Sequence, residues 1–278
     1  MATSGRRAVS RILTYLVLIA AALVTLVPLG AVFLTAIRPQ VGVLLGPFSL
    51  PDEISLQNFY RAWVTGRFSE YFTNSMIITV STVAIVLTIS SFAGYSFAKI
   101  RFPFRDLFFY VTLIGMMVPF QAIMIPLYFL MDDLRLLDTF WSVILTLSAA
   151  GIAFGIFMMR SFFRGLPNEL IESARMDGAA DLTIFARIML PLTSPALVAL
   201  LIFQTMWSWN NFIIPLVFIH DRSMRPIPLA LMHFQSQYET NYALLAAAVL
   251  IGLSPLLVMY ILLQRKVVTG LTMGAIKG

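Results

Sequence analysis

Long apolar stretches without charged side chains dominate the chain. Six of them reach about 20 residues or more: Ile12–Leu34, Asn74–Ala98, Leu107–Leu130, Phe140–Met159, Ala196–Ile219 and Thr240–Leu263. A helix rises about 1.5 Å per residue, so about 20 residues cross a hydrocarbon core about 30 Å thick. Backbone groups cannot stay unpaired in lipid, and we therefore expect each stretch to be helical. The pattern predicts an all-α membrane protein with six transmembrane helices.

The first apolar stretch follows Arg6, Arg7 and Arg11, as the apolar core of a signal peptide would. Such a core runs to about 7–15 residues, whereas Ile12–Leu34 is longer. We therefore expect it to be a retained span.

The composition agrees with a membrane protein. Of the 278 residues, 59% are apolar and 12% charged, and the mean hydropathy is +0.88. A soluble domain carries about twice that charge, so a soluble enzyme is excluded. No internal repeat or soluble domain is left over, which predicts one membrane domain over residues 1–278.

The basic residues are spread unevenly over the segments between spans. With the N-terminus in the cytoplasm, 13 of the 19 Lys and Arg lie inside: Arg6, Arg7, Arg11, Lys99, Arg101, Arg105, Arg160, Arg164, Arg175, Arg187, Arg265, Lys266 and Lys277. The other six lie outside: Arg38, Arg61, Arg67, Arg135, Arg222 and Arg225. Basic residues accumulate on the cytoplasmic side of membrane proteins. We expect both termini in the cytoplasm, inner loops at 99–106 and 160–195, and outer loops at 35–73, 131–139 and 220–239.

Several kinds of chemistry are absent from the sequence. The formal charge of +6 fits basic residues flanking membrane spans better than a nucleic-acid partner. There is no cysteine, and His220 and His233 stand alone, so we expect no disulfide, thiolate or metal centre. No Lys precedes Ser or Thr, so the chain lacks a phosphate-binding G-x-x-x-x-G-K-[ST] loop, and any ATP must be bound by another chain. No predicted span holds an ionisable residue, which argues against a proton-driven carrier and most membrane enzymes.

The inner loop 160–195 predicts two short amphipathic helices joined at a glycine. Pro167 suits a first helical position, and Gly178 suits the left-handed residue just past a helix end. Leu182, Phe185, Ile188 and Met189 form the apolar side of the second helix. Such a pair needs a partner for its apolar edges. Either another protein or the lipid headgroups could cover them, and the amphipathic pattern alone leaves both open.

The residues of this loop resemble a known motif. Glu172-Ser173-Ala174, Gly178 six positions after the Glu, Ile188 sixteen after it, and the closing Leu190-Pro191 resemble the "EAA" loop of ABC importer permeases. Trp209-Asn210-Asn211-Phe212 resembles the fifth-span motif of sugar permeases, and the tail Gly270–Gly278 is similar to the C-terminus of maltose-type carbohydrate permeases. One departure is Ser173, where the motif usually has Ala.

This resemblance implies a type I ABC importer permease fold in a bacterial or archaeal cytoplasmic membrane. The loop would be a coupling element on two cytoplasmic ABC ATPase subunits, which bind ATP and Mg, while this chain binds no cofactor. The implied contact residues are Glu172, Ser173, Ala174, Asp177, Gly178, Ile188, Leu190 and Pro191, with Gly274 and Lys277 in the tail. A paralogous permease would complete the pore, and an extracytoplasmic binding protein would deliver solute near the loop at 220–239.

Polar residues within the predicted spans are candidates for the solute path. Gln204, Ser208 and Asn211 recur at i, i+4 and i+7, on one helix face beside Trp207. Amide groups next to an aromatic ring match the hydroxyls and the C–H face of a sugar. Tyr95, and Gln121 two residues past Pro119, are further candidates. Interhelical hydrogen bonding is the alternative for all of them, whereas Gly151-x-x-x-Gly155 suggests close helix packing.

The sequence thus predicts a non-enzymatic permease subunit that takes up a sugar or oligosaccharide by ATP-driven alternating access. The same type of importer for glycerol phosphate, a polyamine or another small solute is the nearest alternative. A stand-alone carrier or a membrane enzyme is the alternative from another class, and it would require activity of the single chain without an ATPase.

Overall fold

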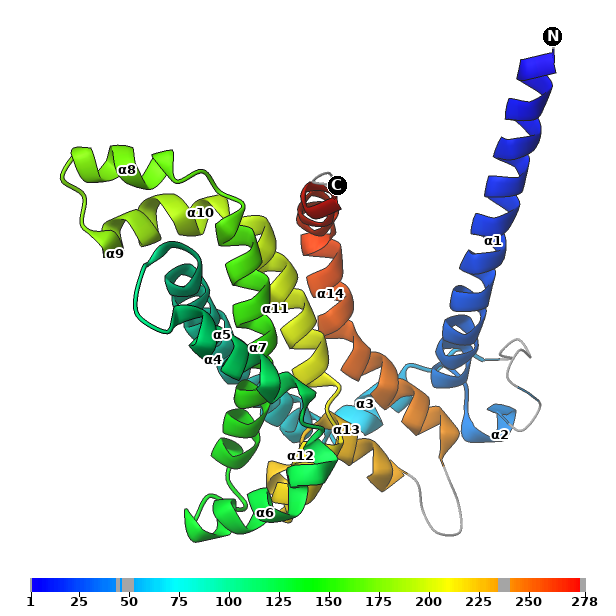
Figure 1. Cartoon of the computed structure of the whole chain (residues 1–278). Coiled ribbons are helices and arrows are strands. Elements are labelled where there is room, and N and C mark those ends of the chain that lie inside the picture. Colours follow the sequence, from blue (N-terminus) through cyan, green and yellow to red (C-terminus); the bar gives the residue numbers. More distant parts are fainter. Residues whose placement is uncertain (1, 44–45, 47–52, 235–240, 276–278) are drawn as a thin grey trace. The chain divides into compact units, whose positions relative to one another are not determined.

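The computed structural model describes residues 2–43, 46, 53–234 and 241–275, and every regular element in these ranges is a helix (Figure 1). The chain forms two compact units. The first contains Met1–Ser69 and Leu231–Leu253, and the second contains Glu70–Ala230 and Ser254–Gly278. The all-α fold predicted from the apolar stretches is confirmed for this described part.

The first unit holds α1 (Ala2–Ala36), α2 (Gln40–Val43), α3 (Gln57–Trp63), η3 (Leu231–Phe234) and the start of α14 (Tyr242–Ala275). Its loop after α1 is built around Arg38, which is 1% exposed. Arg38 Nε donates to the carbonyl of Leu34 at 2.9 Å, and Asn58 Nδ2 donates to the carbonyls of Ala36 and Arg38 at 2.8 and 2.7 Å. These buried polar groups are satisfied by backbone, which fixes the loop.

The second unit is built on α7 (Phe140–Arg164). Around it lie α4 (Phe68–Lys99), α5 (Arg105–Met117), α6 (Phe120–Asp133), α11 (Ser194–Trp209), α12 (Ile213–Phe218), η2 (Arg222–Met224) and α13 (Ile227–Ala230). The segment between α7 and α11 contains α8 (Glu169–Met176), α9 (Asp181–Ile184), the π-helix η1 (Phe185–Met189) and α10 (Leu190–Leu192). Within this unit, α8 and α10 lie at one end of α7, and α6 and α12 lie toward its other end (Figure 1).

Close helix packing in the second unit depends on glycines. A Cβ on Gly151 would lie 2.6 Å from Gln204 Oε1 of α11, and one on Gly155 would lie 2.1 Å from Ser90 Oγ of α4. A Cβ on Gly94 of α4 would lie 2.6 Å from Met159 Cβ. Small residues let helix backbones approach this closely, so the packing role predicted for Gly151 and Gly155 is confirmed.

Two predicted spans are not single helices. The stretch Leu107–Leu130 bends by 98° between α5 and α6. Pro119 has no N–H to donate, and it forces Val118 into an extended conformation at φ −83° and ψ 112°. The stretch Ala196–Ile219 stops at Trp209, and α12 begins separately at Ile213.

The remaining apolar stretches match long helices. Among the described residues, four helices are long and apolar enough to cross a membrane: Arg11–Ala36, Phe68–Lys99, Phe140–Arg164 and Tyr242–Gln264. Two bent pairs, beginning at Arg105 and Asp181, raise the number to six if each pair forms one span. The second pair joins Asp181–Leu192 to Ser194–Trp209 at 75°. Part of the predicted inner loop is therefore continuous with the fifth apolar stretch.

Candidate functional site: a helical hairpin at one end of α7

The hairpin formed by residues 165–193 is anchored at its first residues to the end of α4. Lys99 Nζ, at the end of α4, donates to the carbonyl of Leu166 and to Asn168 Oδ1, both at 2.6 Å. Helix α8 starts at Glu169, so Pro167 lies two residues before it and not at its first helical position as predicted. These hydrogen bonds fix the direction in which the chain leaves α7.

One side of the hairpin packs into the core of the second unit. Ile171 and Ala174 of α8 are each 7% exposed and belong to a cluster with Met159, Phe163 and Met189. The Tyr95 ring contacts the rings of Phe163 and Phe185 at centroid distances of 5.5 and 5.2 Å. The inner apolar edge is therefore covered by the chain itself, and neither a partner nor lipid is needed there, contrary to expectation.

The other side of the hairpin is exposed. Glu172, Ser173, Met176 and Asp177 are exposed, with Met176 at 88%. Leu182 is 66% exposed, so it does not pack with Phe185 as the predicted second helix required. Ser173 Oγ donates to the carbonyl of Glu169 at 2.8 Å, so the hydroxyl at this position is satisfied within α8. The exposed side combines a carboxylate with uncovered apolar side chains.

The turn between α8 and α9 has the geometry that only glycine adopts without strain. Gly178 has φ +79°, as predicted. Its N–H donates to the carbonyl of Arg175 at 3.0 Å, and the N–H of Ala179 donates to the carbonyl of Ala174 at 2.9 Å. This pair of bonds is the Schellman motif, which satisfies the last carbonyls of a helix. Arg175 Nη2 also bonds Asp181 Oδ1 at 2.9 Å, across the turn.

The second arm of the hairpin contains a π-helix that sequence periodicity did not predict. Residues Phe185–Met189 form η1, in which Phe185 and Met189 are buried and Ile188 is partly buried. Leu190 is also partly buried, whereas Pro191 is exposed. Single π-helical turns are rare and occur frequently at functional sites. Thr193, 1% exposed, donates through Oγ1 to the carbonyl of Leu190 at 3.0 Å at the bend into α11.

The three residues of the predicted polar stripe, Gln204, Ser208 and Asn211, do not share one exposed surface. Gln204 is 3% exposed against Gly151, and Ser208 Oγ donates to Thr79 Oγ1 of α4 at 3.5 Å. Asn211 lies beyond α11, where its Oδ1 accepts the N–H of Ile214 at 3.1 Å at the start of α12. This geometry favours the interhelical hydrogen-bond alternative for Ser208, whereas Gln204 packs closely against Gly151 and its buried Nε2 has no hydrogen-bond partner among the described residues.

The other path candidates lie apart from each other. Tyr95 is buried in the hairpin cluster, and Gln121 is exposed at the start of α6. Trp207 is 41% exposed and lines a cavity of about 710 Å³ at the bend between α5 and α6, together with Met116 and Thr146. Pro119 points to a cavity in this part of the chain, but the bend of 98° between α5 and α6 was not predicted.

The C-terminal candidates are described only in part. Gly274 belongs to α14, and Lys277 lies outside the described residues. Within the described ranges no group of three or more His, Asp or Glu could hold a metal ion.

Apolar, membrane-length helices with an exposed hairpin at one end define the class of this protein as a multi-span membrane protein. Residues 87–269 match the family model described as "Binding-protein-dependent transport system inner membrane component". The chain belongs to this family, which is a multi-pass inner-membrane transport component and not an enzyme.

Similar proteins cover nearly the whole chain. The arabinooligosaccharides transport system permease protein AraQ of Halalkalibacterium halodurans is 36% identical, over 98% of this chain and 100% of its own length. The diacetylchitobiose uptake system permease protein NgcG of Streptomyces coelicolor is 31% identical, over 99% of this chain and 91% of its own length. A crystal structure of a bacterial ABC transporter that imports the acidic polysaccharide alginate has a chain with a TM-score of 0.82 and 25% identity, covering 92% of this chain and 96% of that one.

Proposed function

We propose that this chain is one permease subunit of an ATP-driven importer for a sugar or oligosaccharide delivered by an extracytoplasmic binding protein. The substrates named for its relatives, arabinooligosaccharides and diacetylchitobiose, support a carbohydrate. Two cytoplasmic ATPase subunits bind ATP and Mg, and a paralogous permease completes the pore. Both termini lie in the cytoplasm, as the distribution of basic residues supports.

The observation that carries this proposal is the two-sided hairpin. Its inner side is packed into the cluster around Tyr95, Phe163 and Met159, and its outer side presents Glu172, Met176 and Asp177. Packed interiors transmit displacement because they compress little. A push on the exposed side of α8 by an ATPase therefore moves the ends of α4 and α7 with it. This coupled movement of the helices would drive alternating access of the pore.

We assign the ATPase contact to the exposed residues around Glu172, Ser173 and Asp177, with Gly178 setting the turn. Ala174, Ile188 and Leu190 act from inside the hairpin by holding its shape, and Pro191 begins the bend into α11. The tail from Gly274 to Lys277 adds a second ATPase contact. The loop at 220–239 contacts the binding protein on the opposite side of the membrane.

For the solute path we retain Trp207, whose ring is half exposed at the 710 Å³ cavity. An indole ring offers the apolar face on which the C–H side of a sugar packs. Gln121 is exposed and can supply a hydrogen bond. Gln204 and Ser208 support the path by holding α11 against α7 and α4.

Charge reversal on the exposed side of α8 tests the proposal. We expect Glu172→Lys to weaken co-purification of the ATPase and to reduce solute-stimulated ATP hydrolysis, because the new charge faces the same contact. Asp133→Lys, an exposed carboxylate at the end of α6, is the matched control and should leave both unchanged. If Glu172→Lys retains full ATPase binding and stimulated hydrolysis, the hairpin is not the coupling element, and an interfacial helix pair on lipid replaces this interpretation.

A further inference from the structure

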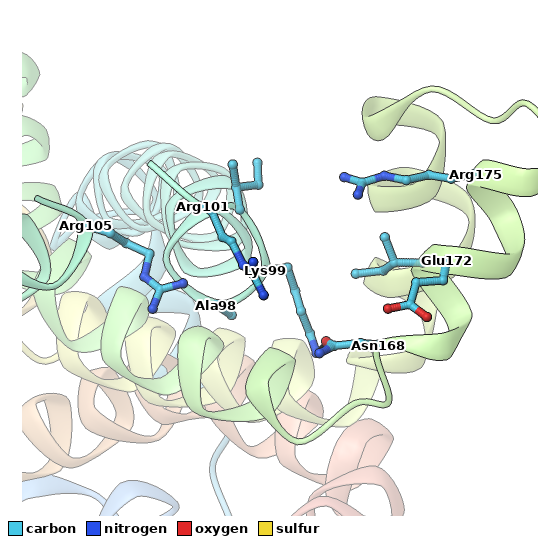
Figure 2. Close-up of a pocket in the computed structure, with 9 residues that line it drawn as sticks. Ala98, Lys99, Arg101, Arg105, Asn168, Glu172 and Arg175 are labelled. Atoms are coloured by element: carbon cyan, nitrogen blue, oxygen red, sulfur yellow. Dashed lines mark hydrogen bonds between the residues drawn. The ribbon is translucent and has the colours of Figure 1, made fainter. Parts of the chain in front are cut away.

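A basic pocket of about 680 Å³ lies between the end of α4 and the hairpin (Figure 2). Lys99, Arg101 and Arg105 face Glu172 and Arg175 of α8 across it. Four basic residues line the pocket against one carboxylate, so the site favours an anion.

The four charges are compensated to different degrees. Arg105 lies 3.5 Å from Asp106, and Arg175 lies 2.9 Å from Asp181. The two hydrogen bonds of Lys99 Nζ instead go to neutral oxygens, the carbonyl of Leu166 and the amide of Asn168. Arg101 is exposed and has no ion-pair or hydrogen-bond partner within the described ranges of the chain. Arg101 therefore supplies unbalanced positive charge, and the charge of Lys99 is offset only in part, by the carboxylate of Glu169.

An exposed apolar face begins directly beside this pocket. Phe104, Phe108 and Val111 are 72%, 54% and 55% exposed, and their i, i+4, i+7 spacing places Phe108 and Val111 on one face of α5. Phe109 is 4% exposed, and Arg160 of α7 lies 3.8 Å from its ring centroid. Helix α5 thus buries one side and leaves an apolar side uncovered next to Arg105.

We infer that the basic pocket binds the headgroup of an anionic glycerophospholipid, with its acyl chains along the exposed face of α5. A free phosphate would use only the pocket, and an acidic protein segment would leave the apolar face uncovered. An amphiphile with an anionic headgroup matches both features at once. Basic pockets on the cytoplasmic side of membrane helices bind such headgroups.

An occupied pocket adds a link between the end of α4 and the hairpin, which already contact through the hydrogen bonds of Lys99 and through the rings of Tyr95 and Phe185. The phosphate lies between Arg101 after α4 and Arg175 on α8, so bound lipid holds the hairpin toward α4. Lipid binding itself does not depend on the proposed transport function, and it is measured without an ATPase or a solute.

The test is titration of the full chain, purified in a neutral detergent, with phosphatidylglycerol and with zwitterionic phosphatidylcholine, followed by native mass spectrometry. We expect phosphatidylglycerol to bind more tightly than phosphatidylcholine. Arg101→Gln should weaken the binding of phosphatidylglycerol about fivefold, which corresponds to about 1 kcal/mol per basic residue at an anionic lipid. Arg101→Lys should retain binding. Arg164, the last residue of α7, does not line the pocket, so Arg164→Gln removes an equal charge and should have no effect.

Three results would overturn the inference. If Arg101→Gln and Arg164→Gln weakened the binding of phosphatidylglycerol equally, the lipid would be held by general electrostatic attraction to the protein surface and not by the pocket. Equal binding of the two lipids would mean that the pocket does not select charge. Displacement of phosphatidylglycerol from the unmodified chain by millimolar glycerol phosphate would mean a site for free phosphate.

Discussion

Replacement of Gly178 is the sharpest perturbation of the hairpin, because its effect is confined to the backbone. At φ +79° an L-residue is strained, and a Cβ added there meets no heavy atom within 4 Å. Contact with the rest of the chain therefore contributes nothing, and the cost is that of Cβ against the local left-handed backbone, about 1–2 kcal/mol. In Gly178→Ala and, more strongly, Gly178→Val, the free hairpin relaxes to another turn, and ATPase docking must restore the native one.

A cost of about 1–2 kcal/mol corresponds to about 5- to 30-fold weaker ATPase binding. The assay is titration of the purified ATPase onto membranes that contain each variant. Gly178→Asn should lose less ATPase affinity than Gly178→Ala, because Asn tolerates the left-handed region. Gly165→Ala is the matched control in the same segment, since Gly165 has φ −72°. The reasoning is refuted if Gly178→Val binds the ATPase as tightly as the unmodified chain, or if Gly165→Ala weakens it equally.

Two further predictions concern stability. Burial raises the pKa of Asp138, but hydrogen bonds from the backbone N–H groups of Asp221 and His220 outweigh it, and the pKa lies below its ordinary value of 3.8. The contribution of the ionised carboxylate is thus full above that value and is lost as the pH falls from it through the lower folded pKa. The difference in melting temperature between the unmodified chain and Asp138→Asn should therefore hold near neutral pH and narrow as the pH falls below about 4; a difference that stays constant to pH 3 would contradict this. Gly155→Ala should destabilise by about 1–3 kcal/mol through overlap with Ser90 Oγ, and adding Ser90→Gly should recover part of the loss in thermal unfolding. An unchanged melting temperature for Gly155→Ala would refute that overlap.

Length and apolarity were enough to locate the long helices, because a membrane-length helix needs about 20 apolar residues whatever it packs against. The stretch Phe140–Met159 matches α7, which continues to Arg164, and Asn74–Ala98 lies within α4. The bend at Val118–Pro119 was not predicted, because proline is tolerated inside membrane helices and does not by itself specify an angle.

The hairpin was predictable where one residue determines the backbone and not where packing does. Gly178 was assigned correctly from its place after an amphipathic segment. The inward packing of Ile171 and Ala174 was missed, because an amphipathic pattern identifies an apolar edge and not what covers it. Periodicity likewise placed Gln204 and Ser208 on one face, but the partners of that face, Gly151 and Thr79, come from distant parts of the sequence.

ATP-dependent uptake by reconstituted proteoliposomes tests the central claim most directly. The vesicles contain this chain with its paralogous permease and ATPase, the binding protein is added outside, and labelled arabinooligosaccharide and diacetylchitobiose are the probes. We predict uptake of an oligosaccharide only when ATP is inside and binding protein outside, with Glu172→Lys abolishing most of it. Equal uptake by vesicles that contain this chain alone, without ATPase or ATP, would contradict the claim and identify a stand-alone carrier.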